Sequence, residues 1–151
     1  DESTVIDFIQ SFKADFMKQE PEEIAFPRGV SGMDKYKDRN TIYAKSTPIA
    51  VKGALLYNHF CRQQKLTNKY PLIQEGDKIK FLNMRTPNRM QSNVISFFTK
   101  LPKELDIHQY LDYDKQFEKA FVEPLTFIMN QIGWNIDRSY GTQMTLEDFF
   151  A

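Results

Sequence analysis

Side chains that bind phosphate are concentrated in the middle of the sequence. Fourteen Lys and Arg residues and only four acids lie between Arg28 and Lys100, a net charge of +10, whereas residues 1–27 and 101–151 each carry −5. Lys and Arg, together with Asn, Thr and Tyr, contact duplex phosphates without reading the base sequence. The pattern predicts a surface that binds nucleic acid through ten candidate residues: Lys52, Tyr57, Asn58, Arg62, Lys78, Lys80, Arg85, Thr86, Asn88 and Arg89.

Ten residues can act as one binding surface only if the fold brings them together. We expect them on a single concave wall that faces a double helix, contributed by a helix, by one face of a strand and by the loop after it. If about six phosphates are neutralised, log affinity should fall with log salt concentration at a slope of about −5. The alternative is that these cations are ordinary solvated surface.

The C-terminal end carries the sharpest local motif, Gln143, Leu146, Phe149 and Phe150. Leu146, Phe149 and Phe150 stand at i, i+3 and i+4, so a single helical turn would present all three on one side. Three large apolar side chains at a chain end favour burial in the pocket of a partner protein. The alternative is that this end folds back onto its own core.

Residue pairs that could catalyse a reaction or hold a metal are not found in the sequence. His59 and Cys61 are two residues apart on a predicted helix and should point to different faces, and His108 has no neighbouring partner. We find neither a glycine-rich phosphate loop nor a pair of acids that could hold two metal ions. We therefore expect no catalytic and no metal-binding residue in this chain.

The composition of the chain indicates its redox compartment and whether it could insert into a membrane. A single cysteine forms no disulfide framework, which favours a reducing cytoplasm. No apolar run approaches the roughly 20 residues that span a bilayer, so we expect no membrane partner.

The elements that must position these residues are mixed. Apolar residues at helical spacing predict a helix from Ser3 or Thr4 to Gln19, and residues 23–26 read as a short extended run. Residues 34–46 are polar and basic without a sustained period, so we predict a loop that crosses between two packed units. The remaining predicted elements are helices over 49–64, 105–113 and 113–131, the last interrupted by Pro124, and strands over 78–82 and 94–98. The fold class is therefore α+β.

Several of these segments, in order along the chain, resemble the C-terminal region of family B replicative DNA polymerases, especially those of large tailed phages. The resemblance covers residues 4–150. It is carried by VKGALLYN at 51–58, FLNMRTPN at 81–88, FEKAFVEPL at 117–125 and the motif at 143–150, which resembles a sliding-clamp-binding peptide. The sequence departs from the phage pattern at 89–92, where Arg-Met-Gln-Ser replaces a glycine-containing sequence.

The resemblance implies a domain organisation. Residues 1–30 would complete the palm subdomain with its last helix and strand. Residues 31–135 would form a mostly helical thumb with a small β element, and residues 136–151 a flexible tail that binds the sliding clamp.

The resemblance also implies a function and its partners. The chain would be the part of a DNA-directed DNA polymerase that grips primer-template duplex and tethers the enzyme to its clamp. The catalytic aspartates, Mg²⁺ and dNTP would belong to the upstream polymerase polypeptide with exonuclease, fingers and palm, so this chain alone should be inactive. That upstream part is either a separate subunit or the rest of a longer chain of which this sequence is a fragment. The expected location is the cytoplasm, that of the host if a phage encodes the chain. The alternative function is a non-enzymatic adaptor that binds DNA and clamp.

Overall fold

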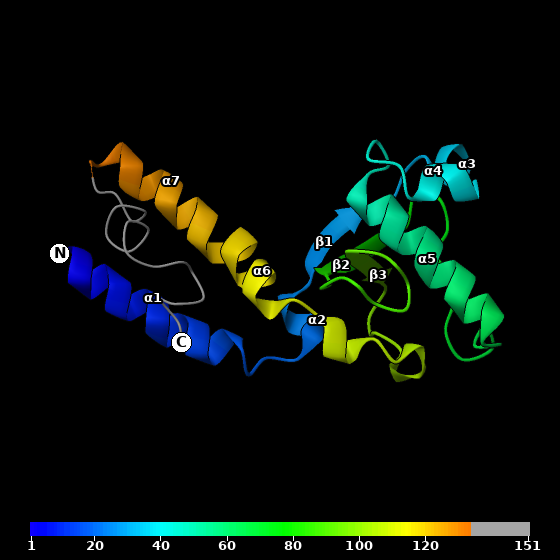
Figure 1. Cartoon of the computed structure of the whole chain (residues 1–151), viewed down its shortest axis with the longest axis horizontal. Coiled ribbons are helices and arrows are strands. Elements are labelled where there is room, and N and C mark those ends of the chain that lie inside the picture. Colours follow the sequence, from blue (N-terminus) through cyan, green and yellow to red (C-terminus); the bar gives the residue numbers. More distant parts are fainter. Residues whose placement is uncertain (134–151) are drawn as a thin grey trace. The chain divides into compact units, whose positions relative to one another are not determined.

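The computed structural model describes residues 1–133 of the chain and divides them into two compact units (Figure 1). Unit 1 combines residues 1–19 with the chain from Tyr113 onward, and unit 2 is formed by Glu20–Asp112. Helices accompany a small antiparallel sheet, which confirms the α+β class. The clamp-binding motif predicted at 143–150 lies outside the described residues.

The secondary structure of unit 1 within residues 1–133 is helical. Helix α1 spans Glu2–Phe16, and its N-cap is Asp1, whose carboxylate accepts a hydrogen bond from the backbone N–H of Thr4 at 2.9 Å. The helix therefore begins slightly before the predicted Ser3 or Thr4 and ends before Gln19.

The other half of unit 1 is a continuous helical run of three parts. These are α6 over Tyr113–Phe117, the π-helical segment η3 over Glu118–Val122, and α7 over Glu123–Gln131. Pro124 lies in the first turn of α7, where its missing N–H and fixed φ are tolerated. The chain stays helical through Pro124, and the predicted interruption takes the form of a change from the π-helical segment η3 to α7 at Glu123.

The core of unit 1 is small and aromatic. Ile9, Phe117 and Val122 are its fully buried members. Phe12 stacks on Phe121 with ring centroids 4.5 Å apart, and Phe16 meets Phe117 edge-on at 5.2 Å. Such aromatic pairs add stability beyond the area that they bury.

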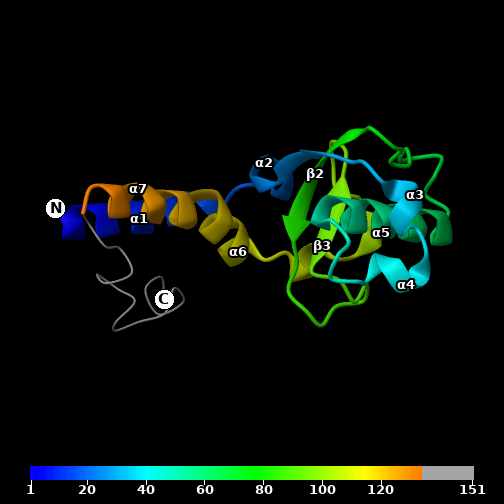
Figure 2. The same ribbon diagram turned by 90° about the horizontal axis from the view of Figure 1, so that it is seen from above.

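Unit 2 contains the sheet, in the order β1-β2-β3 with antiparallel neighbours (Figure 2). Its strands are β1 over Phe26–Gly29, β2 over Lys78–Asn83 and β3 over Val94–Phe97. The extended run predicted at 23–26 is wrong for residues 23 and 24, which are helical, whereas Ala25 is extended and Phe26 begins β1. Pro21–Ile24 is the short helix α2, favoured by proline at its first position and two glutamates in its first turn.

Helix α5, over Ile49–Gln63, lies alongside β3 in close contact. Gly53 permits this approach, because a Cβ atom there would lie 2.6 Å from the backbone N of Ser96. The hydroxyl of Ser96 donates a 3.0 Å hydrogen bond to the carbonyl oxygen of Ala50. The side chain of Ser96 therefore marks the face of the sheet that α5 covers.

Two predicted segments, the loop at 34–46 and the helix at 105–113, contain short helical turns instead. The loop predicted at 34–46 contains α3 over Met33–Tyr36 and α4 over Arg39–Ile42, and it lies within unit 2 instead of crossing between two units. The helix predicted at 105–113 is instead two short 3₁₀ turns, η1 over Lys103–Leu105 and η2 over His108–Tyr110.

The palm, thumb and tail boundaries at residues 30 and 135 stay predictions, since compactness alone does not assign a functional subdomain. Strand β1 ends at Gly29 and is hydrogen-bonded to β2. Residues on both sides of position 30 therefore share one sheet.

Candidate nucleic-acid interface

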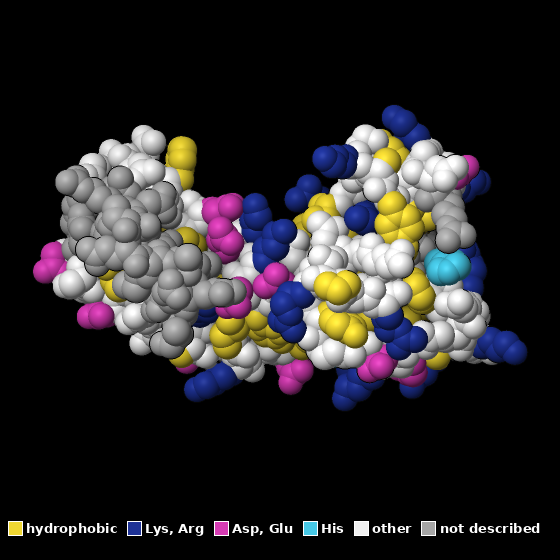
Figure 3. All heavy atoms as spheres, in the orientation of Figure 1, with side chains coloured by type: hydrophobic (Ala, Val, Ile, Leu, Met, Phe, Trp, Pro, Cys, Tyr) yellow, Lys and Arg dark blue, Asp and Glu magenta, His cyan; other side chains and the backbone are white. Residues whose placement is uncertain are grey.

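The two units carry opposite charge. Unit 2 has fifteen Lys and Arg residues and ten acids, a net charge of +5, whereas the sequence assigned to unit 1 has five and ten, a net charge of −5. Figure 3 shows the Lys and Arg side chains at several separate places on the visible face, with other side chains between them. A basic unit suits a polyanionic partner, and the placement of each candidate residue decides which surface could bind it.

Tyr57 and Asn58 are interior residues. Tyr57 is 2% exposed, its hydroxyl donates a hydrogen bond to the carbonyl oxygen of Pro71 at 3.1 Å, and burial raises the pKa of its phenol. The amide of Asn58 donates to the carbonyl oxygen of Ile73 and accepts from its backbone N–H, each at 2.8 Å. The predicted phosphate contacts of these two residues are corrected: both anchor the segment that follows α5.

Asn88 organises the loop after β2. Its side-chain amide donates to the carbonyl oxygens of Arg85 at 2.8 Å and Ser92 at 2.6 Å. Its side-chain oxygen accepts from the backbone N–H of Met90 at 2.9 Å. Asn88 is 9% exposed, so its predicted role as a phosphate ligand is also corrected to a structural one.

The same loop presents three predicted residues to solvent, namely Arg85, Thr86 and Arg89. The guanidinium of Arg85 donates to the carbonyl oxygens of Gln109 and Leu111, the latter at 3.1 Å. Arg89 faces Asp106 at 3.4 Å in an exposed ion pair. Such pairs contribute about 0–1 kcal/mol, so a phosphate can replace the carboxylate.

Lys78 and Lys80 lie on the opposite face of the sheet from α5. Ser96 on β3 points toward α5, and Phe81, its partner on β2, points the same way because directly paired residues share a face of the sheet. Successive side chains along a strand point to opposite faces. Lys80, whose ammonium donates to the carbonyl oxygen of Glu22 at 3.2 Å, therefore points away from α5, as does Lys78. The single concave wall that we predicted for all ten residues is thus not formed.

Helix α5 carries the other two predicted cations. Lys52 donates to the side-chain oxygen of Asn93 at 3.1 Å and lies 5.8 Å from the ring centroid of Tyr43. Partial burial lowers the pKa of the Lys52 ammonium. Arg62 is exposed near the end of the helix. Lys52, Arg62 and the loop residues 85, 86 and 89 remain the candidate phosphate contacts.

The sequence analysis missed a pocket of about 420 Å³ between α4, α5 and the loop after β2. Its walls combine apolar and aromatic side chains with three basic ones and no acid. A basic, aromatic-containing segment at 34–46 and exposed His59 were the available signals, but the pairing of these segments is tertiary. The lining residues are Lys37, Ile42, Tyr43, Leu56, His59, Phe60, Gln63, Arg89, Met90 and Gln91.

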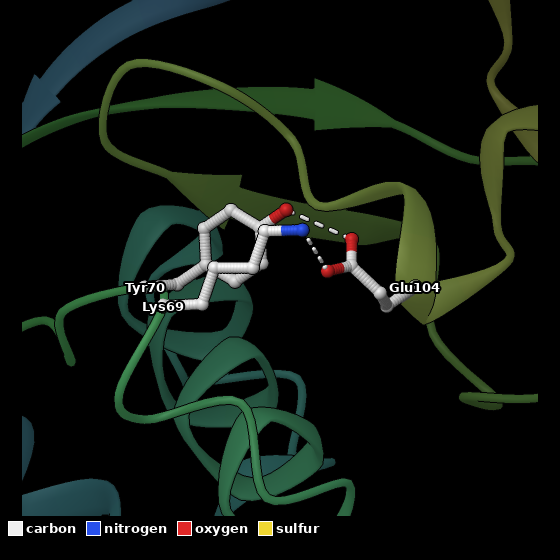
Figure 4. A network of polar contacts seen from close by, with 3 residues as sticks. All are labelled: Lys69, Tyr70 and Glu104. Atoms are coloured by element: carbon white, nitrogen blue, oxygen red, sulfur yellow. Dashed lines mark hydrogen bonds and ion pairs between the residues drawn. The ribbon is translucent and has the colours of Figure 1, made fainter.

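A separate polar cluster ties the chain after α5 to η1 (Figure 4). The carboxylate of Glu104 accepts hydrogen bonds from the Lys69 ammonium and the Tyr70 hydroxyl, each at 2.8 Å. These hydrogen bonds lower the pKa of Glu104 to about 2, and the bond from Lys69 has the largest effect. The cluster holds two connecting segments together.

The described residues offer little support for a reactive nucleophile or a metal site. Cys61 is buried, and burial raises the pKa of its thiol, which disfavours the reactive thiolate. His59 is exposed on the same helix, as the spacing predicted. Across residues 1–133 we find no group of three or more His, Cys, Asp or Glu side chains able to hold a metal ion. Every helix in this range is too short or too polar to cross a membrane.

The chain shows a distant similarity to a known protein. The chain is 25% identical over 140 residues to the DNA-directed DNA polymerase of Enterobacteria phage T4. The alignment covers 90% of this chain and 15% of that polymerase, so the chain spans a small part of the length of its relative. No family model matches the chain. The similarity supports a polymerase-related role.

Proposed function

We propose that the chain is the thumb-containing end of a DNA-directed DNA polymerase, which grips primer-template duplex and tethers the enzyme to a sliding clamp. The similarity to a phage polymerase along 90% of the chain is the observation that carries this proposal. Residues 1–30 would complete the palm, 31–135 would form the thumb and 136–151 the clamp-binding tail. The basic charge of unit 2 is consistent with a thumb that contacts DNA.

The duplex contacts that we propose are fewer than the sequence predicted. Lys52, Arg62, Arg85, Thr86 and Arg89 can all present polar groups to a phosphate, whereas the interior positions of Tyr57, Asn58 and Asn88 exclude them. Lys78 and Lys80 are left out because they point to the other face of the sheet from α5. Four cations remain, so the salt slope of duplex binding should be about −4 rather than −5.

Unit 1 supports the proposed contact with the rest of the polymerase. Phe127, Ile128 and Ile132 on α7 and its C-terminal end are 67%, 56% and 60% exposed, and Phe8 on α1 is 58% exposed. We take these exposed apolar side chains as part of a protein interface, since burying them against a partner would be favourable. We assign it to the upstream polypeptide that would contain the exonuclease, fingers and palm, because the chain corresponds to only 15% of its relative.

Catalysis belongs to that upstream polypeptide in this proposal. Phosphoryl transfer by polymerases uses metal ions held by carboxylates, and the described residues contain no cluster of three or more candidate ligands. The upstream polypeptide would hold Mg²⁺ and the dNTP, and this chain would hold the DNA product.

Reconstitution of primer extension tests the proposal. The chain and the upstream polypeptide from the same source should extend a primer together and not separately. Phe127→Ser should weaken their association about tenfold or more, as loss of an apolar anchor does. Gln131→Ser, an exposed change on the same helix, is the matched control. Unchanged extension when the chain is omitted would contradict the proposal.

The tail is tested by clamp binding. Phe149→Ala and Phe150→Ala should each cost about 2 kcal/mol or more if these rings fill a pocket together with Leu146, while Gln143 bonds to the clamp. Calorimetric titration with the sliding clamp measures the loss. An unchanged affinity would remove the tether from the proposal.

The second candidate function is an adaptor that binds DNA and clamp without an enzyme. The same cations and tail would serve it. Primer extension on reconstitution separates the two functions, because the adaptor predicts DNA and clamp binding with no polymerase activity in any mixture.

A further inference from the structure

The pocket between α4, α5 and the loop after β2 has a lining that suits a nucleotide. Its volume of about 420 Å³ lies within the range typical of small-ligand sites. Leu56 and Met90 are buried and form an apolar base, and Tyr43 and Phe60 add two aromatic rings. Aromatic rings are the surfaces on which unpaired bases stack.

The polar groups of the pocket match the remaining parts of a nucleotide. Gln63 and Gln91 carry exposed side-chain amides, each with a donor and an acceptor that can meet the edge of a base. Lys37 and Arg89 carry positive charge, and their carboxylate partners, Asp34 at 3.5 Å and Asp106 at 3.4 Å, belong to exposed pairs that a phosphate can displace.

The aromatic side of the pocket is held in place before any ligand binds. The hydroxyl of Tyr43 donates to the carbonyl oxygen of Met90 at 3.1 Å, which fixes the ring against the loop after β2. That loop is in turn fixed by Asn88, whose side chain bonds the backbone of Arg85, Met90 and Ser92. A rigid stacking surface binds a base with less loss of conformational freedom.

A duplex does not fit this arrangement of groups. In a double helix the base faces are stacked on one another, so the rings of Tyr43 and Phe60 can stack only on a base that has left the helix. The residues proposed for the duplex contact its backbone from outside, and of these only Arg89 also lines the pocket.

We propose that this pocket binds one unpaired nucleotide of a DNA single strand, with its base against Tyr43 and Phe60 and its phosphate beside Lys37 or Arg89. The proposal rests on the DNA-binding part of the proposed function. It assigns this unit a second mode of contact, with single-stranded DNA, beside its grip on duplex.

Binding of a short fluorescein-labelled oligothymidylate to the whole chain, followed by anisotropy, tests this site. Tyr43→Leu should weaken that binding about fivefold or more, the loss of one stacked base. Tyr43→Phe loses the same hydroxyl bond to Met90 but keeps the ring, so its affinity should stay within about twofold of the wild type. The affinity of each variant for a blunt duplex should stay within about twofold of the wild type, because Tyr43 bears on the duplex only through its ring contact with Lys52.

The outcomes separate the pocket from the proposed function. Duplex binding without oligothymidylate binding, or equal affinity of Tyr43→Leu and Tyr43→Phe for the oligothymidylate, overturns the pocket and leaves the duplex grip standing. A parallel loss of duplex binding in Tyr43→Leu also overturns it, since the pocket would then serve paired DNA. If the wild type binds neither DNA, both proposals fail.

A cross-link locates the bound base independently. An oligonucleotide with a single 5-iodouracil, irradiated on the wild-type chain, should attach to Tyr43 or Phe60 and be found there by peptide mass spectrometry. Attachment confined to residues outside the pocket would overturn the assignment.

Discussion

The two units differ in how many of their large hydrophobic side chains are buried and how many are exposed. Of the 25 buried hydrophobic residues described, 22 lie in unit 2, where a helix packs on a sheet, and only Ile9, Phe117 and Val122 lie in unit 1. Of the seven exposed large hydrophobic side chains described, six lie in unit 1 and only Tyr43 in unit 2. Unit 2 has a large core, whereas the described part of unit 1 has a small core and exposes several large apolar side chains.

The two units also differ in net charge. Unit 2 is basic and unit 1 is acidic, so a polyanion is attracted to the first and repelled by the second. We infer a division of labour in which unit 2 meets DNA and unit 1 meets protein. The predictions below test whether the two units are stabilised separately and whether they bind separately.

The largest effect is expected from Phe117→Ala. Phe117 is fully buried in a core of three residues, and removing its ring should cost about 3–5 kcal/mol. Hydrogen exchange followed by mass spectrometry should show lost protection in α1 and α6, with β2 and β3 unchanged. Equal loss of protection in the sheet would show that the units unfold as one.

Gly53→Ala is the corresponding disruption of unit 2. The new Cβ would lie 2.6 Å from the backbone N of Ser96 and 2.9 Å from the carbonyl carbon of Ile95, so α5 must move off β3. We expect a loss of about 3 kcal/mol in the stability of unit 2. Gly29→Ala is the matched control, because nothing lies within 4 Å of its new Cβ. Similar urea midpoints for the two variants would refute the close approach.

Asn58→Ala should have a smaller effect. It leaves the backbone N–H and carbonyl of Ile73 without their side-chain partner in a buried site, at a cost of about 2 kcal/mol. The exposed change Gln63→Ala on the same helix serves as the control in chemical denaturation. If Asn58→Ala instead left stability unchanged and weakened duplex binding, the original assignment of Asn58 to a phosphate contact would be restored.

The smallest effect concerns pH and Glu104. Its pKa is lowered to about 2 from an ordinary 4.5, so its carboxylate stabilises the fold above the ordinary value, and that contribution is lost as pH falls toward 2. Carboxyl ¹³C shifts measure the midpoint. Tyr70→Phe, which removes one donor, should raise it, and a wild-type midpoint near 4.5 would refute the cluster.

Local chemistry was enough to predict much of the fold. The apolar spacing of 49–64 and the alternation of Lys78, Ile79 and Lys80 placed α5 and β2 to within about a residue, because each pattern is repeated within its own element. The extended run at 23–26 failed at its first two residues because the apolar residues there lie across the end of α2 and the start of β1.

The candidate site was less predictable because it depends on how elements pack. Nothing local shows that Tyr57 and Asn58 face inward, since their polar atoms are satisfied by residues 71 and 73. Which face of the sheet Lys78 and Lys80 point to is decided by the pairing of β2 with β3 and by the position of α5, neither of which is visible in the sequence. The pocket forms only where α4, α5 and the loop after β2 meet, which no single motif encodes.

Duplex binding at several salt concentrations tests the central claim, that unit 2 is the DNA-binding unit. For the whole chain we expect a slope of log affinity against log salt of about −4, and removal of two cations by the double change Lys52→Gln and Arg62→Gln should reduce it to about −2. The double change Lys18→Gln and Lys119→Gln removes two exposed cations from unit 1 and should leave the slope unchanged. A flat salt dependence, or an equal loss from both double variants, would contradict the claim.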